Sequence, residues 1–408
     1  MSKTTKIILI LIFILIIAIV GFFFYKSKTD KPIINPITNQ PFDPFGPNRE
    51  NNEGGEEVEN EKPEWTNNTN SVQSKFYQIT NFAVAGASFY EQKITVVNPE
   101  NKTETVSTVP SLSYVERATG HIYQMNIENR ETNKVSNSTI PNVYEVFIDK
   151  LSDTFIYRYL AEDNKTITTF MAKLGNSKGE FLATDIIDMS LSSDRTKAFY
   201  LAKNSTGVIG FNLSLQDNKK SQVFTSSFTE WISQWVENQK IYLTTKPSSL
   251  VSGSIFSLDT QNGTLIKIFG GVDGLTTLSN SDGSQVLYGA SLSTGPKLWL
   301  LNTEDHTTTD LNSFGLPEKC VWSKDDIHVY CAVPNKVVGT QYPEYWYQGL
   351  ISFDDYFVKI NTITKEKVTL ANSQDETPID GTYLFLDKEE SRLFFINKKN
   401  STLWSLDL

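Results

Sequence analysis

The residue types that carry acid–base and metal chemistry are sparse in this chain. Its three histidines, His121, His306 and His328, are far apart in the sequence, and no two of them share the spacing of metal ligands. No His-Glu-x-x-His or Cys-x-x-Cys sequence occurs. We therefore interpret the histidines as structural or surface residues, and we predict no metal site and no cofactor.

One short string matches a catalytic motif. Residues 175–179 read Gly-Asn-Ser-Lys-Gly, which is the G-x-S-x-G pattern of serine hydrolases. That motif requires a turn from a strand into a helix within an α/β domain. Here it joins two strand-like runs, 166–174 and 180–185, so it is typical of a hairpin turn. We predict no catalytic residue in this string.

Paired carboxylates offer an alternative chemistry. Glycosidases use two Asp or Glu side chains on either side of the scissile bond, and the chain has 47 acidic residues. It has only six arginines, so it lacks the arginine cluster with which sialidase-type propellers hold a carboxylate. A carbohydrate-active enzyme with paired carboxylates is therefore an alternative function, without assigned catalytic residues.

Residues 334–356 combine aromatic and acidic side chains in a way that is typical of binding surfaces. Aromatic rings with a few polar groups are common in binding hot spots and in platforms for sugars or peptides. The alternative is that these rings plug the mouth of a central channel or pack against a neighbouring element. The candidate binding residues are Tyr342, Glu344, Tyr345, Trp346, Tyr347, Phe353, Asp354, Asp355 and Tyr356.

The elements that carry these residues repeat along the chain. An aromatic residue recurs in a strand-like apolar run at successive intervals of 43, 43, 42, 46, 42 and 65 residues. A period of 42–46 is about the length of a four-stranded propeller blade. The insertion 334–356 accounts for most of the one long interval. The repeated aromatic residues are Tyr114, Tyr157, Tyr200, Tyr242, Tyr288, Tyr330 and Phe395.

Each repeat divides into short strands separated by Asp, Asn, Gly and Ser, as hairpin-linked strands do. The last repeat has sequence for three strands only, and Ser74–Thr80 can supply the fourth. Pairing the two ends of the domain closes the ring and removes exposed sheet edges. We predict an all-β, seven-bladed β-propeller over residues 74–408. Six or eight blades are alternatives, because the first repeat, Val84–Ser136, is the least regular.

The repeat resembles that of TolB-type propellers, a WD-like repeat in which a turn of the type Ser-x-Asp-Gly precedes an apolar strand that contains tyrosine. The turns at Ser192–Asp194, Ser279–Gly283 and Trp322–Asp325 carry this resemblance, as do the strand ends Leu298–Asn302 and Leu403–Asp407. The resemblance is better over 186–408 than over 75–185. It implies the fold. TolB itself is a periplasmic partner in an envelope complex and has an added α/β domain, so its partnership is not implied.

The N-terminal part is of a different kind. Ile7–Phe24 is a run of eighteen residues without a charge, which as a helix spans about 27 Å, close to the thickness of a bilayer core. We predict a transmembrane anchor at 1–28, with a cleaved signal peptide as the alternative. Residues 29–73 contain six prolines and an acidic run, which predicts a disordered linker. We expect a single-pass protein with a cytoplasmic N-terminus and an extracytoplasmic propeller.

Charge and cysteine content agree with this location. Residues 1–31 carry a net charge of +4, so the rest of the chain carries −14 of the total of −10, which argues against nucleic acid as a partner. A turn between Asp325 and Asp326 places Cys320 opposite Cys331, at a position where a disulfide can form. A disulfide would indicate an oxidising compartment. The alternative is two buried free thiols.

These observations favour a membrane-anchored, extracytoplasmic propeller that acts as a non-catalytic recognition module. Its expected partner is an envelope protein, a peptide or a glycan, bound by the 334–356 insertion and the loops between blades. The alternatives are the carbohydrate-active enzyme described above and a structural envelope protein. No sequence feature distinguishes among the partner classes.

Overall fold

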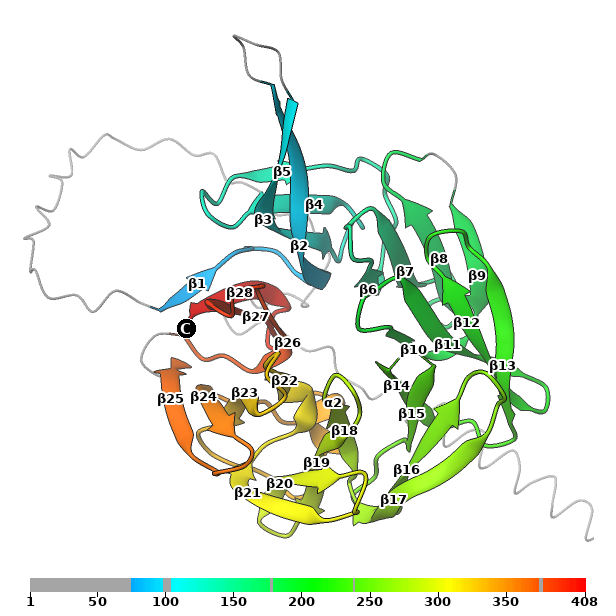
Figure 1. The fold of residues 1–408 in the computed structure, drawn as a ribbon, viewed down its shortest axis with the longest axis vertical. Coiled ribbons are helices and arrows are strands. Elements are labelled where there is room, and N and C mark those ends of the chain that lie inside the picture. The colour runs from blue at the N-terminus through cyan, green and yellow to red at the C-terminus, as the bar shows by residue number, and fades with distance from the viewer. Residues whose placement is uncertain (1–74, 98–103, 177–178, 238, 374–376) are drawn as a thin grey trace, which may run out of the picture. The chain divides into compact units, whose positions relative to one another are not determined.

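A computed structural model describes residues 75–97, 104–176, 179–237, 239–373 and 377–408. These residues form seven four-stranded antiparallel sheets arranged as blades around a common axis (Figure 1). The predicted seven-bladed propeller is therefore confirmed, and the alternatives of six and eight blades are wrong. Within the described ranges no helix is long and apolar enough to cross a bilayer. The predicted anchor at 7–24 and the predicted linker at 29–73 lie outside the described residues.

The blades share one order, in which the first strand lies next to the axis and the fourth lies at the rim (Figure 1). The strands, blade by blade, are β2 (Val84–Val97), β3 (Glu104–Glu116), β4 (Ile122–Asn126) and β5 (Thr132–Lys134); β6 (Val143–Ile148), β7 (Thr154–Leu160), β8 (Ile167–Lys173) and β9 (Glu180–Thr184); β10 (Ile186–Leu191), β11 (Lys197–Asn204), β12 (Gly207–Ser214) and β13 (Lys220–Ser226); β14 (Trp231–Glu237), β15 (Lys240–Thr245), β16 (Ser252–Asp259) and β17 (Leu265–Asp273); β18 (Thr276–Ser279), β19 (Gln285–Leu292), β20 (Gly295–Asn302) and β21 (Thr308–Phe314); β22 (Cys320–Trp322), β23 (His328–Pro334), β24 (Asp355–Asn361) and β25 (Lys367–Asn372); and β26 (Gly381–Leu386), β27 (Arg392–Asn397), β28 (Thr402–Asp407) and β1 (Phe76–Gln78).

The two ends of the domain close the ring as predicted. β1 pairs antiparallel with β28, with Phe76 opposite Leu406 and Gln78 opposite Trp404. The seventh blade therefore takes its outer strand from the start of the domain and its other three strands from the end. The exposed edge that a three-stranded last blade would have is thereby paired.

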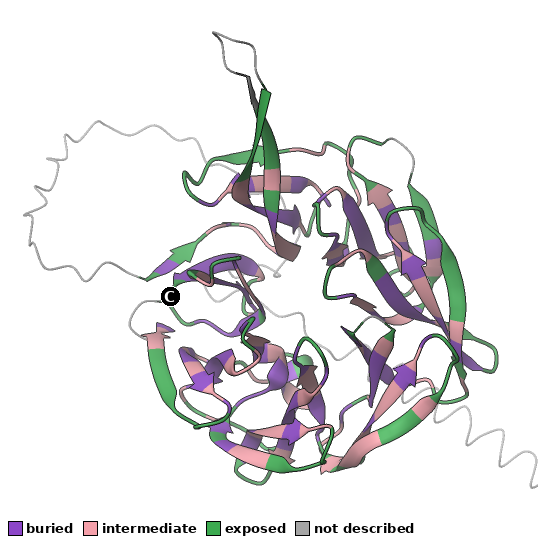
Figure 2. Cartoon of the chain, viewed as in Figure 1, coloured by how far each residue is buried: buried purple, intermediate pink, exposed green. Residues whose placement is uncertain are grey.

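The seven repeated aromatic residues occupy equivalent positions, each on the second strand of its blade, and all are buried. They fill the interfaces between neighbouring sheets, which Figure 2 shows as buried segments of the inner strands. Tyr242, for example, donates a hydrogen bond to the carbonyl of Gly283 in the next blade (2.7 Å). The repeat in the sequence is thus the repeat of the interfaces between blades.

The turns between first and second strands explain the Ser-x-Asp-Gly pattern. Gly283 has φ +76°, and the equivalent residues Arg195 and Glu390 also have positive φ. Three residues before each of them, an oxygen-bearing side chain accepts a backbone N–H from the start of the second strand. Asn280 accepts in this way from Gln285 (3.0 Å), and Asp387 accepts from the backbone N–H of Arg392 (3.1 Å). Short polar side chains are favoured in such turns for this reason.

The propeller has two faces, which we call upper and lower. The upper face carries the connections between blades and the loops between second and third strands, and these contact each other, as where Lys398 N–H donates to Asp380 O (2.8 Å). The lower face carries the remaining hairpin turns. The chain enters β1 at the lower face, where Asp407 N–H donates to Lys75 O (3.1 Å).

The first blade has unusually long inner strands. β2 continues to Val97 and pairs along its length with β3. The extension forms a two-stranded hairpin that projects from the ring (Figure 1). Ile94 and Val106 on this hairpin are exposed, so no buried face marks the extension in the sequence.

Cys320 and Cys331 form a disulfide between β22 and β23, with Cα atoms 4.1 Å apart. The strand register is the predicted one, with Val321 opposite Tyr330 and Trp322 opposite Val329. No free cysteine occurs in the described chain.

Candidate functional site

The insertion lies on the upper face of blade 6, between β23 and β24. Because β23 ends at Pro334 and β24 begins at Asp355, the loop itself comprises residues 335–354. Asp355 and Tyr356 therefore belong to a blade strand, which corrects the predicted extent of the insertion. The loop contains one short helix, α2 (Glu344–Tyr347).

Three of the candidate aromatic residues are interior residues. Tyr342, Trp346 and Phe353 are buried, and they form a small apolar cluster with Leu316. The Tyr342 and Phe353 rings stack with centroids 5.9 Å apart. These rings stabilise the loop against the blades, and of the three only Trp346 also borders a surface pocket.

A buried charge network lies beneath the loop. Lys319, Asp355 and Asp380 all have fully buried side chains. Lys319 follows β21 in the 3₁₀ helix η1 (Pro317–Lys319), and its Nζ donates to Asp355 Oδ2 (2.8 Å), to Asp380 and to the carbonyl of Gly381 (3.0 Å). Buried charges require such pairing, because an unpaired one is strongly destabilising.

Asp380 connects this network to the insertion. Its carboxylate accepts hydrogen bonds from Trp346 Nε1 (3.0 Å), Ser352 Oγ (3.1 Å) and the backbone N–H of Phe353 (3.0 Å). Burial alone would raise the pKa of Asp380, but Lys319 and these donors lower it below its usual value. Asp380 therefore remains ionised and holds the loop to blade 7.

Asp355 behaves differently from Asp380. Burial raises the pKa of Asp355 to about 6, and Lys319 only partly opposes this shift. Asp355 also accepts the backbone N–H of Gly381 (2.7 Å), while its Oδ1 is buried without a partner. Asp355 is thus the member of the network that gains a proton near pH 6.

The loop is also attached at its two outer ends. Glu344 accepts a hydrogen bond from the backbone N–H of Ser249 (2.7 Å), in the loop between β15 and β16 of blade 4. Asp354 forms an ion pair with Lys399 of blade 7 (2.5 Å). The insertion of blade 6 therefore extends over blade 5, and Glu344, Tyr345 and Asp354 are only half-buried.

Tyr347 is the exposed member of the predicted set, with 41% of its surface accessible. Its hydroxyl donates to Glu318, and burial of the hydroxyl, with the Glu318 charge, raises the pKa of Tyr347 well above its usual value. Beside Tyr347 lies a pocket of about 500 Å³. Its lining includes Leu278, Pro317, Glu318, Trp346, Tyr347, Tyr383, Leu384 and Lys398.

Tyr383, on the first strand of blade 7, forms the other exposed wall of this pocket. The register of β26 shifts between Thr382 and Phe385, and Tyr383 has φ 51°, so it leaves the regular alternation of the strand and is 64% exposed. Burial of its hydroxyl among neighbouring blades raises the pKa of Tyr383 to about 12. Glu145 adds to this shift, and Arg158 and Arg117 oppose it. Charged side chains of blades 1 and 2 therefore lie close enough to Tyr383 to influence its pKa.

Two cations lie near Tyr383 without a carboxylate partner among the described residues. Lys398 Nζ lies 5.0 Å from the centre of the Trp346 ring, and Arg117 donates to Ser401 Oγ (3.3 Å). Both contacts involve the turn from Asn397 to Ser401, in which Ser401 N–H donates to Asn397 O (2.7 Å). We call the group Arg117, Tyr144, Tyr347, Tyr383 and Lys398 the upper mouth.

A second pocket of about 560 Å³ adjoins the upper mouth on the side of blades 1 and 2. Arg117 and Tyr144 line it, together with the apolar residues Val143, Leu160 and Ile167. Tyr144 itself lies beside the ion pair of Arg158 with Glu145 (2.6 Å). The upper mouth therefore has an apolar pocket on each side.

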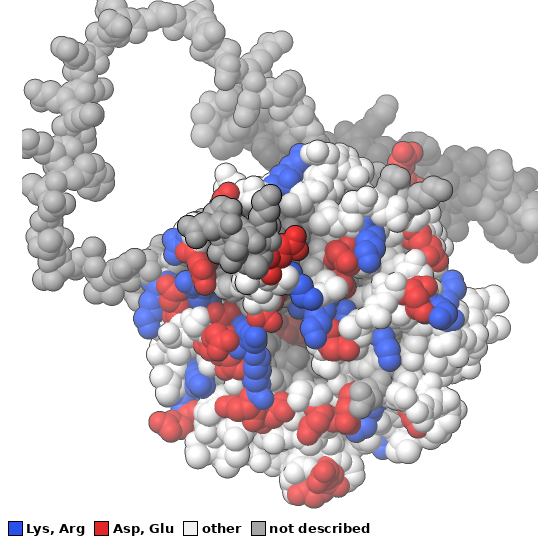
Figure 3. Space-filling model, turned by 45° about the horizontal axis from the view of Figure 1, so that its top comes forward, with Lys and Arg blue, Asp and Glu red and all other residues white. Residues whose placement is uncertain are grey.

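Elsewhere the surface charges are intermixed. Figure 3 shows acidic and basic side chains close together over one face of the molecule. Many form ion pairs, such as Lys388 with Glu91 (2.9 Å) and Lys246 with Glu230 (2.8 Å).

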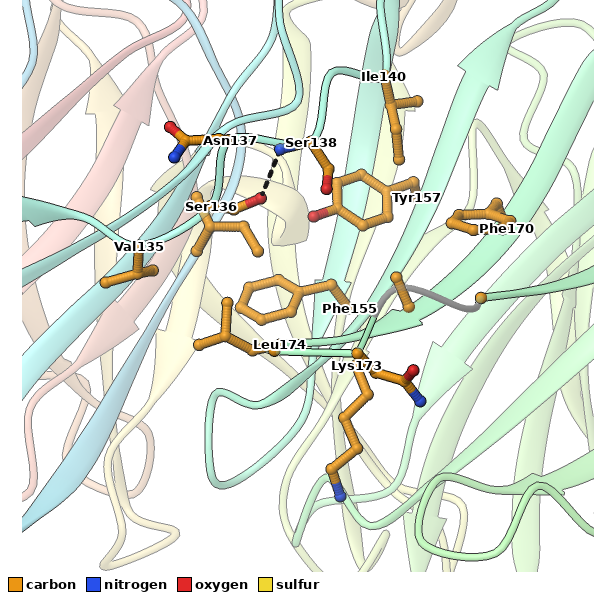
Figure 4. Close-up of a pocket in the computed structure, with 15 residues that line it drawn as sticks. Val135, Ser136, Asn137, Ser138, Ile140, Phe155, Tyr157, Phe170, Lys173 and Leu174 are labelled. Atoms are coloured by element: carbon orange, nitrogen blue, oxygen red, sulfur yellow. Dashed lines mark hydrogen bonds between the residues drawn. The ribbon is translucent and has the colours of Figure 1, made fainter.

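A third pocket, of about 510 Å³, lies at the rim between blades 1 and 2 (Figure 4). It opens where β5 ends after three residues, and Phe155 and Tyr157 of β7 form much of its apolar lining. Ser136 and Ser138 line its edge and are joined by a hydrogen bond (3.3 Å). Lys173 is its one titratable side chain apart from Tyr157, so its lining does not provide an acid–base pair.

The three histidines and the string 175–179, which the sequence also singled out, lie in turns and in local hydrogen-bond clusters. His328 Nδ1 lies 2.6 Å from Asp325, His121 lies in a polar cluster with Thr139, and His306 is in a turn. The described residues contain no group of three or more His, Cys, Asp or Glu side chains that could hold a metal. The string 175–179 lies in the hairpin between β8 and β9, and its Ser177 is outside the described residues.

Sequence reasoning missed Lys319, Asp380, Lys398, Arg117 and Tyr383. The first two are separated by 61 residues, and each occurs in a segment that resembles an ordinary polar loop. The sequence contains no pattern that predicts the upper mouth, since Arg117 is simply one of six arginines.

No protein-family model matches the chain, and no curated protein matches it. Among solved structures, an oligogalacturonate lyase in complex with manganese is 9% identical, with a TM-score of 0.53 over 80% of this chain and 98% of that chain. An oligogalacturonate lyase from Vibrio parahaemolyticus is 11% identical, with a TM-score of 0.51 over the same shares. TolB from Acinetobacter baumannii is 11% identical, with a TM-score of 0.43 over 70% of this chain and 80% of that chain. The predicted resemblance to TolB-type propellers is confirmed at the level of the fold, and these likenesses extend no further.

Proposed function

We propose that the chain is a membrane-anchored, extracytoplasmic propeller that acts as a non-catalytic recognition module. Its contact surface is the upper face around the upper mouth. The observation that carries this proposal is the arrangement of the insertion, which is held by a buried charge network and leaves Tyr347 exposed beside a pocket of about 500 Å³.

A fixed loop of this kind suits binding. Tyr342, Trp346 and Phe353 pack inside, so the loop is already packed before a partner arrives and loses less ordering entropy on association. Exposed tyrosines on a rigid scaffold are frequent anchors in recognition surfaces. The two interpretations of the insertion, packing and binding, therefore apply to different residues of the same loop.

The anchor and the location are part of the proposal. The apolar run Ile7–Phe24 supports a membrane anchor. The disulfide between Cys320 and Cys331 is compatible with an oxidising compartment. The chain enters β1 at the lower face, so the upper mouth lies at the opposite end of the blades from the attachment of the linker.

Site-specific photocrosslinking in the native membrane tests the proposal. A photoreactive residue is placed at Tyr347 or at the exposed Leu350 on the upper face, and at the exposed Ile363 on the lower face as the matched control. We expect a discrete covalent adduct from the two upper positions and none from position 363. Adducts from position 363 alone, or from no position, would contradict recognition by the upper face.

A carbohydrate-active enzyme is the second candidate, and the fold shared with two oligogalacturonate lyases is the observation that favours it. Incubation of the full chain with oligogalacturonate, followed by chromatography of the products, tests this candidate. Shortening of the oligosaccharide would replace the recognition proposal by an enzymatic one. An unchanged chain length would remove this candidate for that substrate.

A further inference from the structure

The amine of Lys319 and the carboxyl group of Asp380 are held in direct contact. Lys319 Nζ donates a hydrogen bond to Asp380 Oδ1, and both side chains are fully buried. The two residues are 61 positions apart, so the contact joins the connection before blade 6 to the connection before blade 7. Two reactive groups fixed in this way react as if at very high concentration, because the entropy of bringing them together is already lost on folding.

The surroundings of the amine are apolar. Lys319 Nζ lies 5.3 Å from the centre of the Trp346 ring and 5.3 Å from that of the Phe353 ring. An ion pair depends on solvation more than a neutral amine and a neutral carboxylic acid do. Burial therefore reduces the cost of moving one proton from Lys319 to the ionised Asp380. This transfer produces the nucleophile and the electrophile of an amide-forming reaction.

The donors around Asp380 are placed for a developing oxyanion. Its Oδ2 accepts hydrogen bonds from Trp346 Nε1 (3.0 Å), Ser352 Oγ (3.1 Å) and the backbone N–H of Phe353 (3.0 Å). Attack of an amine on Cγ moves negative charge onto an oxygen of the carboxyl group. Donors fixed at Oδ2 stabilise that charge, as in an oxyanion hole. Oδ1, which contacts Lys319, is then the oxygen that departs.

Asp355 is the acid–base group of this site. Its Oδ2 accepts a hydrogen bond from Lys319 Nζ (2.8 Å), and its Oδ1 is buried with no hydrogen-bond partner among the described residues. Burial raises the pKa of Asp355 to about 6, so this carboxylate accepts and returns a proton readily near neutral pH. A buried oxygen without a partner is costly in a purely structural ion pair. It is suited to a group that carries a proton between neighbours.

We propose that Lys319 and Asp380 form an intramolecular isopeptide bond, with Asp355 as the proton relay. The described geometry is the ion pair that precedes this bond. The bond from Lys319 Nζ to Asp380 Cγ forms, and the bond from Asp380 Cγ to Oδ1 breaks. Of the three ammonium protons, one stays on the amide nitrogen, one passes directly to Oδ1, and one reaches Oδ1 through Asp355. The oxygen leaves as water, so the reaction needs no oxidant and no co-reactant.

The bond closes a covalent loop around one whole blade. Strands β22 to β25 and the insertion all lie between residues 319 and 380. The disulfide between Cys320 and Cys331 closes only a smaller loop within this one. The isopeptide bond would therefore hold the insertion and blade 6 to blade 7 even in reducing conditions. This inference does not depend on the recognition function proposed above.

Peptide mapping of the full-length chain tests the proposal. The chain is purified in detergent, reduced, denatured and digested with trypsin, and the peptides are measured by mass spectrometry. We expect peptides 298–324 and 368–388 as one joined species, lighter than their sum by one water molecule, because trypsin does not cleave after a lysine that carries an amide. The partly exposed pair of Lys399 with Asp354 is the internal control, and its peptides should be recovered separately.

Two variants separate the reaction from the fold. Lys319→Arg keeps a positive charge in the site but has no attacking amine, and Asp355→Asn removes the relay but keeps both reacting groups. Neither should yield the joined species, and thermal unfolding shows whether each variant folds. On a denaturing gel after reduction, the unmodified chain should migrate faster than Lys319→Arg, because its closed loop remains compact. A joined species from Asp355→Asn at the level of the unmodified chain would overturn the role of Asp355.

The unmodified chain decides the proposal even if neither variant folds. Separate peptides 298–319 and 368–388, each with the mass of its sequence, would overturn the inference. A separate peptide 368–388 that has lost one water molecule would also overturn it. That result would indicate a succinimide at the sequence Asp380-Gly381 instead of a bond to Lys319.

Discussion

Lys319 donates a hydrogen bond to Asp355 at 2.8 Å, although the two residues are 36 positions apart and neither side chain has any exposed surface. The pair joins the connection before blade 6 to the third strand of that blade. Asp380 completes the network and binds the insertion through Trp346 and Phe353. The irregular loop between β23 and β24 is therefore attached to a charge cluster whose three ionisable side chains are fully buried.

Replacing Lys319 should be strongly destabilising. The variant Lys319→Met leaves two buried carboxylates without their cation, and loss of one partner from a buried ion pair costs about 3–5 kcal/mol. Urea unfolding followed by tryptophan fluorescence measures this loss. Lys399→Met, which breaks the partly exposed pair with Asp354, is the control and should cost about 1 kcal/mol or less. Similar losses for both variants would contradict a structural role of the buried network.

Asp355 should make stability depend on pH. Its pKa in the folded protein is about 6, above the ordinary value of 3.8, so between these values the folded state binds more protons than the unfolded state. The contribution of Asp355 is therefore favourable below pH 4 and is lost as the pH rises through 6, by up to about 3 kcal/mol. Asp380 has a lowered pKa and acts with the opposite sign, so it contributes most above pH 4.

The variant Asp355→Asn isolates this term. Urea unfolding of the unmodified chain and the variant is compared at intervals from pH 4 to pH 7. We expect the stability of the unmodified chain, relative to the variant, to fall as the pH rises across this window. A relative stability that increases with pH would show that Lys319 holds Asp355 ionised, and the assigned direction would be wrong.

Gly283 should be irreplaceable at its turn. It has φ +76°, and a Cβ atom there would lie 2.4 Å from Val236 Cγ1 and 2.8 Å from Tyr242 Oη. Gly283→Ala should therefore cost about 2–4 kcal/mol, from backbone strain together with displacement of the interface between blades. Gly271→Ala is the matched control, since φ is +85° and nothing lies within 4 Å, and it should cost only about 1–2 kcal/mol. Thermal unfolding of the two variants distinguishes the clash from the strain.

These turns show why so much of the fold could be predicted from the sequence. A turn of Asn280 and Gly283 followed by an apolar strand is a local pattern, and Tyr242 and its equivalents recur because every interface between blades has the same geometry. The disulfide register followed from counting outward from one turn, with Cys320 opposite Cys331. Because these local patterns recur from blade to blade, each occurrence supports the interpretation of the others.

The site was less predictable because it depends on contacts between distant segments. The insertion was identified as an irregular interval, but which of its rings are buried depends on Lys319 and Asp380, which the sequence places in unrelated loops. Tyr383 faces the pocket because β26 shifts register, and the residues around it have no pattern that predicts the shift. Arg117 of blade 1 reaches Ser401 of blade 7 only because the ring closes.

The disulfide should stabilise blade 6. Cys320 and Cys331 are 11 residues apart, and a bond that closes a loop of this length contributes about 2–3 kcal/mol. Reduction should therefore lower the melting temperature of the unmodified chain. It should leave the double variant Cys320→Ala, Cys331→Ala unaffected. A melting temperature of the unmodified chain that is insensitive to reductant would contradict a stabilising disulfide in the isolated protein.

We expect the buried residues of the insertion to contribute to stability and its exposed residue Tyr347 to contribute to binding. Replacing residues 336–353 by a short glycine–serine link removes Trp346 and Phe353 from their contacts with Asp380, and it also uncovers Leu316, so we expect a loss of about 3–5 kcal/mol. Tyr347→Ala removes an exposed ring from the same loop and should change stability by about 1 kcal/mol or less. It should nevertheless abolish the crosslinks obtained from Leu350, because the ring forms the wall of the pocket.

Thermal melting and crosslinking are measured on both variants. If Tyr347→Ala destabilised the protein as much as the loop replacement, the exposed ring would be part of the packing, and the binding surface would have to be sought at Tyr383 and Tyr144 instead.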